Sequence, residues 1–101
     1  MTEHPSIGPA SRVMIARDIH SRKFEESCVI LDLGRGDYFG LDELGSAIWN
    51  HFAKGCSMAE VAQAVCGERD VEYDRALNDV VAFASDLAKK GLVVVASESN
   101  V

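Results

Sequence analysis

The sequence has little of what several protein classes require. Its three cysteines, Cys28, Cys56 and Cys66, are at least ten residues apart and form no CxxC pair. Neither a disulfide framework nor a zinc knuckle is therefore indicated. No apolar run approaches the roughly 20 residues of a membrane span, and the N-terminus lacks the apolar segment of a secretion signal. These absences predict a cytoplasmic protein without a membrane segment.

Basic residues are scarce as well. Sixteen acidic side chains outnumber ten basic ones, which leaves a net charge of −6. This balance disfavours association with phosphate backbones, so nucleic acid is not an expected partner. The apolar fraction of 48% and the charged fraction of 26% are those of an ordinary globular protein. A chain of 101 residues suits one domain with one modest core.

Both prolines fall within the first nine residues. Together with a glycine and small polar residues, they predict a flexible N-terminal arm over residues 1–11. The last residues, 97–101, are expected to form a flexible tail. The folded domain should therefore span residues 12–96.

Apolar and β-branched segments predict strands over residues 13–19 and 28–33. In the second strand, alternation places Cys28, Ile30 and Asp32 on one face and Val29, Leu31 and Leu33 on the other. The glycine-rich turn 34–36 then leads into a short antiparallel strand over residues 37–41. Such a strand at a sheet edge offers unpaired backbone groups that can recruit an extended peptide.

Capping signals mark two helices after these strands. Asp42 is an expected N-cap, and the helix that follows should run to about Lys54 before Gly55 ends it. Ser57 and Glu60 have the spacing of a capping box, which opens a second helix. Gly67 is expected to close that helix.

The third predicted helix, about 73–90, is the longest element. It carries two neighbouring apolar stripes, one of Leu77, Val81, Ala84 and Ala88 and the other of Ala76, Val80, Phe83 and Leu87. An apolar surface this broad suggests a second contact beyond the domain core, although the preferred interpretation is that both stripes pack against the sheet and first helix of the domain itself. Gly91 should stop the helix, and residues 92–95 can add a short closing strand.

Candidate catalytic and metal-binding groups have simpler explanations. His4, His20 and His51 have no histidine or carboxylate at i+4, so no metal site is expected on one helix face. The adjacent acids Asp42 and Glu43 are explained by capping and the helix dipole. We expect no catalysis, no metal and no cofactor.

Three helices beside a small sheet also describe a DNA-binding winged helix, which charge argues against. Between Ser57 and Asp86 there are seven acids and two bases, a net of −5 that phosphates would repel. Four bases, Arg12, Arg17, Arg22 and Lys23, cluster at the first strand and its turn. They form either a small basic flank or a solvated edge that deters aggregation.

The order of motifs resembles the PqqD family, also called RiPP recognition elements. The resemblance rests on VILDL, a glycine-rich turn, DYFGLDELGSAIW, S-x-x-E-V and DVVAFASDLAKKGL, and it covers about Arg12 to Val95. It implies an α+β, winged-helix-like domain with a three-stranded antiparallel sheet followed by three helices. It also implies binding of the leader segment of a ribosomally made precursor peptide.

In such domains the leader adds a strand beside the third sheet strand and lies against the third helix. Carried onto this chain, the implied peptide-binding residues are Asp37, Tyr38, Phe39, Gly40, Leu41, Tyr73, Ala76, Asp79, Val80 and Phe83. Whether Tyr38 or Phe39 points into the groove depends on strand register, which the sequence leaves open. The family often has Asp-Pro where Glu72-Tyr73 opens the helix here, so a different leader specificity is expected.

The resemblance implies a non-catalytic peptide chaperone that presents a precursor to a modifying enzyme. That enzyme is either a radical SAM enzyme, as for coenzyme PQQ, or a leader protease and cyclase pair, as for lasso peptides. Two alternatives stay open at this point. One is an acidic winged-helix transcription regulator, and the other is a subunit-interaction domain that forms a homodimer through the same edge strand.

Overall fold

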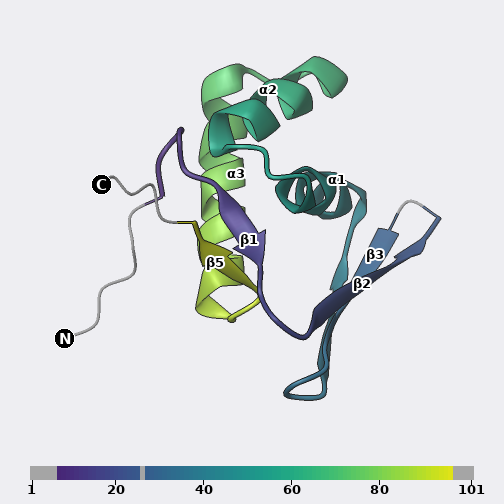
Figure 1. Cartoon of the computed structure of the whole chain (residues 1–101). Helices are drawn as coiled ribbons and strands as arrows, with labels where there is room; N and C mark the ends of the chain where they lie inside the picture. The colour runs from purple at the N-terminus through teal and green to yellow at the C-terminus, as the bar shows by residue number, and fades with distance from the viewer. Residues whose placement is uncertain (1–6, 26, 97–101) are drawn as a thin grey trace.

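Five short strands and three helices make up the described part of this computed structural model, residues 7–25 and 27–96 (Figure 1). In chain order they are β1 (Val13–Ile15), β2 (Ile19–Phe24), β3 (Ser27–Asp32), β4 (Asp37–Leu41), α1 (Glu43–Ala53), α2 (Met58–Glu68), α3 (Tyr73–Lys89) and β5 (Val93–Val95). The antiparallel sheet β2-β3-β4, the three helices and the short closing strand confirm the expected α+β, winged-helix-like fold.

The single strand predicted over residues 13–19 is wrong, because the chain changes sheets within it. β1 pairs with β5 in a separate two-stranded sheet, and Ile19 begins β2. Between them Asp18 adopts a left-handed conformation with φ of 62°, which ends the extended run. The polar segment 20–24 thus supplies a strand of the main sheet that apolar patterning did not mark.

The hairpin of β3 and β4 sets the face of every side chain in β4. The Asp32 carboxylate accepts the Arg35 backbone N–H at 3.1 Å, and Gly36 has a φ of 80° in the turn. In the resulting register Phe39 lies opposite Ile30, and Tyr38 lies opposite Leu31. Because opposite residues share a face, Phe39 points toward the core and Tyr38 points outward. The two faces expected for β3 are confirmed, and burial shows that Cys28, Ile30 and Asp32 form the inward one.

Side-chain caps begin α1 and α2 as predicted. Asp42 Oδ1 accepts the Gly45 backbone N–H at 2.8 Å. Ser57 and Glu60 form the reciprocal capping box, with bonds of 2.8 and 3.2 Å. The prediction that Gly67 closes α2 is wrong: the helix continues to Glu68, and the chain leaves it at the extended residue Arg69.

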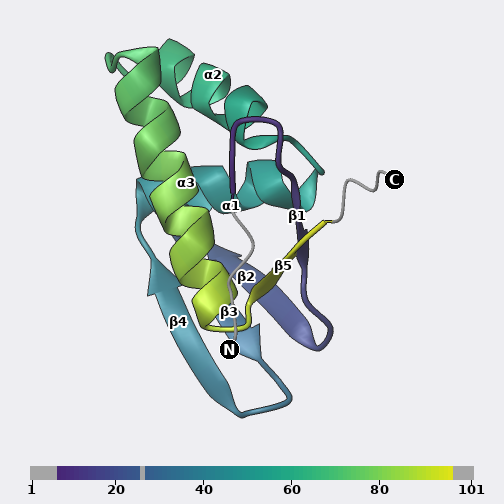
Figure 2. The same ribbon diagram turned by 90° about the vertical axis from the view of Figure 1, so that its left-hand side faces the viewer.

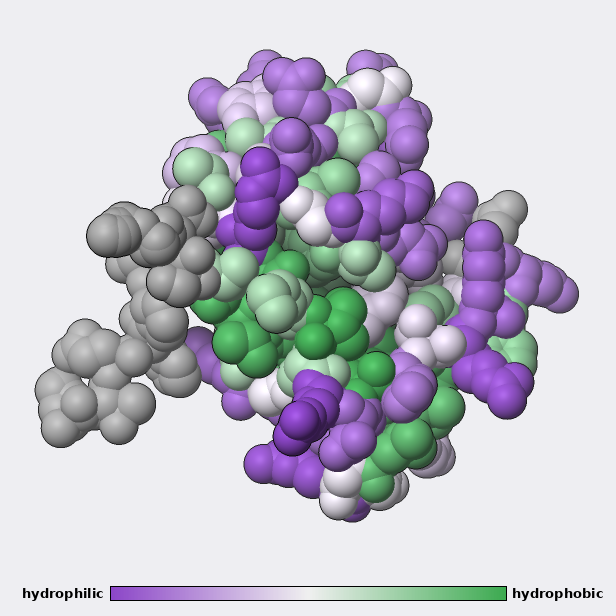
Figure 3. Space-filling model, in the orientation of Figure 1, coloured by the Kyte–Doolittle hydropathy of each residue, from purple (hydrophilic) through white to green (hydrophobic). Residues whose placement is uncertain are grey.

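The core lies between the inner face of the main sheet and the helices (Figure 2). Its largest fully buried side chains are Trp49, Phe52, Ile30, Met58, Leu92, Val13, Val61 and Val80. The buried residues of α3 come from both stripes and are Ala76, Val80, Ala84 and Leu87. The other members, Leu77, Val81, Phe83 and Ala88, are partly buried against the same core. The width of the apolar surface on α3 is therefore explained largely by packing inside the domain. Outside the core, Met14 and Val94 pair across β1 and β5 and stay more than half exposed, and hydrophobic surface gathers over these strands in Figure 3.

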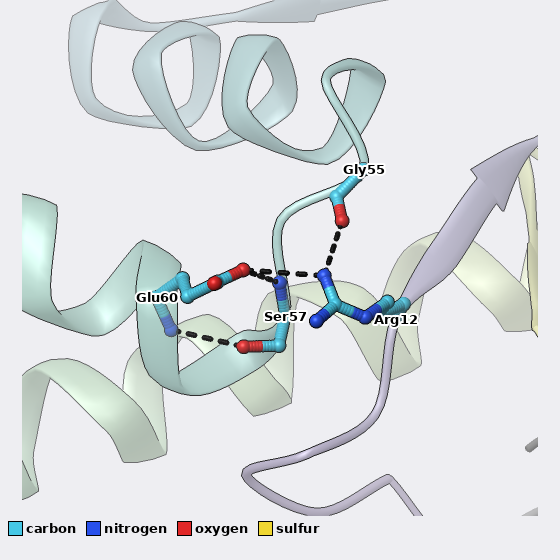
Figure 4. Close-up of polar contacts among 4 residues, drawn as sticks. All are labelled: Arg12, Gly55, Ser57 and Glu60. Atoms are coloured by element: carbon cyan, nitrogen blue, oxygen red, sulfur yellow. Dashed lines mark hydrogen bonds and ion pairs between the residues drawn. The ribbon is translucent and has the colours of Figure 1, made fainter.

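The segment before β1 contacts the start of α2. Met58 and Ala59 donate backbone N–H groups to the carbonyls of Ser11 and Pro9, at 2.9 and 2.8 Å. Arg12 Nη1 donates to the Gly55 carbonyl at 2.6 Å and to Glu60 Oε1 at 3.2 Å (Figure 4). Residues 1–6 of the predicted arm and the tail 97–101 lie outside the described residues, and the domain bounds 12–96 stay a prediction. None of the helices described has the length and apolar character that crossing a membrane requires.

Candidate functional site

The edge of β4 is open along the described chain. β4 pairs with β3 on one side, and no described strand pairs with its other side. β4 leads directly into α1, and α3 lies on the helical side of the sheet in both ribbon views (Figures 1 and 2). An open edge leaves backbone donors and acceptors available to an added strand.

The hydrogen-bond phase of the sheet identifies which groups of β4 are open. Leu33 donates its N–H to the Asp18 carbonyl at 2.9 Å, so this pair continues the β2–β3 ladder as a bonded pair. Hydrogen-bonded and non-hydrogen-bonded pairs alternate along an antiparallel ladder. Because Leu33 bonds to the β2 side, the N–H and C=O groups of Ile30, three residues earlier, point toward β4. Phe39, opposite Ile30, therefore bonds to β3. The backbone groups of Tyr38 and Gly40 consequently point to the open edge.

A cavity of about 290 Å³ lies between the start of α1 and the middle of α3. Its lining residues are Asp42, Leu44, Gly45, Ile48, Asp79 and Phe83. Phe83 is held by stacking on Phe52, with ring centroids 6.3 Å apart and planes 22° apart. The cavity thus combines apolar side chains from two helices with one carboxylate from each side.

Two details shape this cavity, one on α1 and one on α3. A side chain at Gly45 would meet Asp42 Oδ1 at 3.2 Å and Leu41 Cβ at 3.5 Å, so glycine allows the first turn of α1 to approach the end of β4. Asp79 on the other wall has Arg75 Nε at 4.0 Å across one helical turn, an exposed pair of small energy. The carboxylates of Asp42 and Asp79 therefore stay accessible to a ligand at the rim.

The structure places the ten site residues predicted from the sequence in different surroundings. Asp79 and Phe83 line the cavity, and Phe39 and Leu41 face the core side of β4. Asp37, Tyr38 and Gly40 lie exposed along the strand, with Tyr38 directed to the opposite face.

The remaining three predicted residues lie elsewhere. Ala76 and Val80 are 1% and 0% exposed in the core, where their side chains are out of reach of a ligand. Tyr73 lies ten residues before Phe83, about 15 Å along the helix axis, at the end of α3 distant from β4 (Figure 2).

Sequence reasoning missed the contribution of α1. Leu44 and Ile48 line the cavity with Asp42 and Gly45. Their i, i+4 spacing was visible in the sequence, but it is equally typical of a core stripe. Whether one side of that stripe is exposed depends on how α1 packs against α3, which the sequence pattern does not show.

A second cavity, of about 350 Å³, lies between β2, β3, α1 and the end of α2. It is mainly polar, with Ser21, Lys23, Cys28, Ser46 and Arg69 among its lining residues. Burial raises the pKa of the Cys28 thiol, against the opposing effects of hydrogen bonds with Ser46 and Ser21 and the charge of Lys23. A thiol with a raised pKa stays protonated at neutral pH and is a poor nucleophile. Within residues 7–25 and 27–96, no three His, Cys, Asp or Glu side chains converge as metal ligands would.

An antiparallel sheet whose edge strand β4 leads into a helix-walled apolar cavity defines a winged-helix-like domain suited to strand addition. The family model for "Coenzyme PQQ synthesis protein D (PqqD)" matches residues 27–93 of this chain. The chain belongs to this family. A comparison with curated proteins found no match.

Two solved structures are similar over most of the chain. One is TbiB1 in complex with the TbiA(beta) leader peptide, which is 32% identical and has a TM-score of 0.76. The match covers 87% of this chain and 98% of that one. The other is a lasso peptide synthetase B1 complexed with the leader peptide, 26% identical with a TM-score of 0.77. That match covers 82% of this chain and 98% of the other.

Proposed function

We propose that this protein is a non-catalytic recognition element that binds the leader of a ribosomally made precursor peptide by strand addition. The observation that carries the proposal is the open edge of β4 next to the apolar cavity between α1 and α3. The two similar structures, each described as a leader-peptide complex, support the same ligand class.

In the proposed complex the leader lies antiparallel or parallel along β4. Its backbone bonds to the N–H and C=O groups of Tyr38 and Gly40, which need no particular leader sequence. Alternate leader side chains then point to the inner side of the sheet, where an apolar one enters the cavity between Ile48 and Phe83. Specificity therefore comes from the cavity, whereas affinity comes from the cavity and from the backbone hydrogen bonds to β4.

The proposed site differs in part from the set that the resemblance implied. Tyr38 and Gly40 contribute backbone groups, and Phe39 and Leu41 form the inner surface of the strand. The cavity side chains are Asp42, Leu44, Ile48, Asp79 and Phe83. The carboxylates of Asp42 and Asp79 disfavour a leader with an acidic side chain next to its apolar anchor.

The proposed contribution to biosynthesis is to raise the local concentration of the precursor peptide and not to catalyse a reaction. Holding the leader keeps the rest of the precursor near a modifying enzyme bound to the same protein, and this raises its effective concentration. A radical SAM enzyme and a leader protease with a cyclase are both compatible with this role. The cytoplasm, where precursor peptides are synthesised, is the compartment we propose.

A titration tests the proposed function. The ¹⁵N-labelled protein is titrated with the synthetic leader of the precursor peptide encoded beside its gene, and backbone amide shifts are followed. The largest shifts are expected at Tyr38, Gly40 and Phe83. A scrambled leader of the same composition is the control. No saturable shift with the leader, or saturable shifts confined to α2, would contradict the proposal.

A further inference from the structure

The outward face of the main sheet has an unusual composition for so acidic a protein. The register directs the following residues of the three strands away from the core: His20, Arg22, Phe24, Ser27, Val29, Leu31, Tyr38 and Gly40. None of them is acidic, although the chain has sixteen acids and a net charge of −6. The inner positions of the strands, by contrast, include Asp32 and Asp37.

This face, which we call the outer sheet face, has an apolar centre and a cationic side. Val29 and Leu31 form its centre on β3, and Tyr38 beside them on β4 is 74% exposed. Leu33 continues the same row past the end of β3 and is 61% exposed. Arg22 lies opposite Val29 on β2, with His20 opposite Leu31. The helices lie on the other side of the sheet in both ribbon views (Figures 1 and 2).

The outer sheet face is continuous with the edge to which the leader is proposed to add. A leader strand beside β4 would place every second side chain on this same face, next to Tyr38 and Gly40. Apart from Gly40 and its two chain neighbours, no described residue has an atom within 4 Å of the position that a Cβ at Gly40 would occupy. At this position a docking protein can therefore reach the leader strand beside β4. A protein that docks on the outer sheet face would therefore contact the recognition element and the bound leader together.

Charge indicates the chemistry of the partner. Apolar side chains beside an arginine and a histidine complement a protein surface that has apolar side chains bordered by carboxylates. One arginine and one histidine are too few for the multiple phosphate contacts of nucleic acid.

We infer that the outer sheet face is the docking surface for the peptide-modifying enzyme, which presents an apolar patch bordered by carboxylates. This inference rests on the proposed leader-binding function. The enzyme would thereby recognise the complex with leader more tightly than the protein alone, because the added strand enlarges the docking surface.

Two single substitutions on the outer sheet face, one of a charged and one of an apolar side chain, test the inference. The variants are Arg22→Glu and Leu33→Ser, both at exposed positions outside the leader site. Lys54→Glu, which reverses an exposed charge at the end of α1, is the control. The probe is the purified peptide-modifying enzyme encoded beside the gene, and its binding to the immobilised full chain is measured with and without synthetic leader. Leader binding is measured separately by fluorescence anisotropy.

The expected result is at least a tenfold loss of enzyme affinity for Arg22→Glu and Leu33→Ser, with leader affinity within twofold of the parent. Lys54→Glu should bind both partners as the parent does. Unchanged enzyme binding by both outer-face variants overturns the inference. Light scattering that shows a parent dimer, made monomeric by Arg22→Glu, also overturns it in favour of a second copy. If the parent fails to bind leader, the proposed function fails. If the parent binds leader but binds the enzyme no more tightly when leader is present, the shared docking surface is overturned while the proposed function stands.

Discussion

Phe83 has a structural role and a proposed binding role. Its ring stacks on the buried Phe52 and also lines the cavity between α1 and α3. Removing the ring takes away packing that holds the helix and apolar surface of the proposed leader site. Stability and affinity must therefore be measured separately for this residue.

We expect Phe83→Ala to lower the unfolding free energy by about 2 kcal/mol and to weaken leader binding roughly tenfold. Val81→Ala is the matched control, because Val81 is partly buried on another side of α3 and does not line the cavity. Urea denaturation followed by the fluorescence of Trp49 measures stability, and anisotropy of a labelled leader measures binding. Equal losses of leader affinity in the two variants would show that the cavity is not the leader site.

Glu60 makes a second residue-scale prediction, about pH. The Ser57 backbone N–H that bonds to its carboxylate holds the pKa of Glu60 below its ordinary value, and the nearby Arg12 acts in the same direction. The ionised form therefore stabilises the folded state above the unfolded pKa of about 4.3, and this contribution is lost as the pH falls through the lower folded pKa.

Glu60→Gln should consequently lower the urea midpoint at neutral pH. The difference from the parent should shrink as the pH falls through the lowered folded pKa, where the parent carboxyl becomes protonated. Urea titrations of both proteins at neutral pH and over a series of acidic pH values make the comparison. A difference that stays constant with pH would mean that Glu60 acts through its shape rather than its charge.

At the scale of elements, the phase of β4 determines which backbone groups are available. Phe39 bonds to β3, whereas the N–H of Gly40 faces the open edge. Proline is tolerated in edge strands where its missing N–H would face solvent, and it is disruptive where that N–H belongs to the ladder. Neighbouring residues of one strand should therefore respond oppositely to the same substitution.

Gly40→Pro should fold and bind leader at least tenfold more weakly, since one edge donor is lost. Phe39→Pro should instead destabilise the domain, because it removes a bond to β3 and a side chain packed on the core. Gly40→Ala keeps the N–H and has room for its methyl group, so it serves as the control. Circular dichroism and leader titrations distinguish these outcomes. Parent-like leader affinity in a folded Gly40→Pro would disprove strand addition at this edge.

The sequence predicted most of the helices and strands, but it did not predict how all of the strands pair. Caps at Asp42 and Ser57 were readable because the donors they satisfy lie within one helical turn. The strand 19–24 was missed because it has one buried residue, and its pairing with β3 holds it in place. The break between β1 and β2 likewise depends on β5, which pairs with β1 from the other end of the chain.

At the scale of the whole molecule, charge separates this domain from the DNA-binding proteins whose architecture it resembles. The segment from Ser57 to Asp86, which contains α2 and most of α3, has a net charge of −5. We expect no mobility shift of duplex DNA at micromolar protein, even at low salt, because a helix in this segment would be repelled by phosphates. A shift that weakens steeply with added salt would favour the regulator alternative instead.

The sequence by itself determined the acidic character and the strand over residues 37–41, because these depend on composition and on local patterns, and its order of motifs implied the fold class through the family resemblance. Tertiary structure alone decided that Tyr38 faces outward and Phe39 inward, since register comes from pairing with β3. It also decided that Ala76 and Val80 are core residues, and that Leu44 and Ile48 line the cavity with Phe83. The side of a helix that stays open depends on how its neighbours pack, and periodicity within one segment carries no information about that.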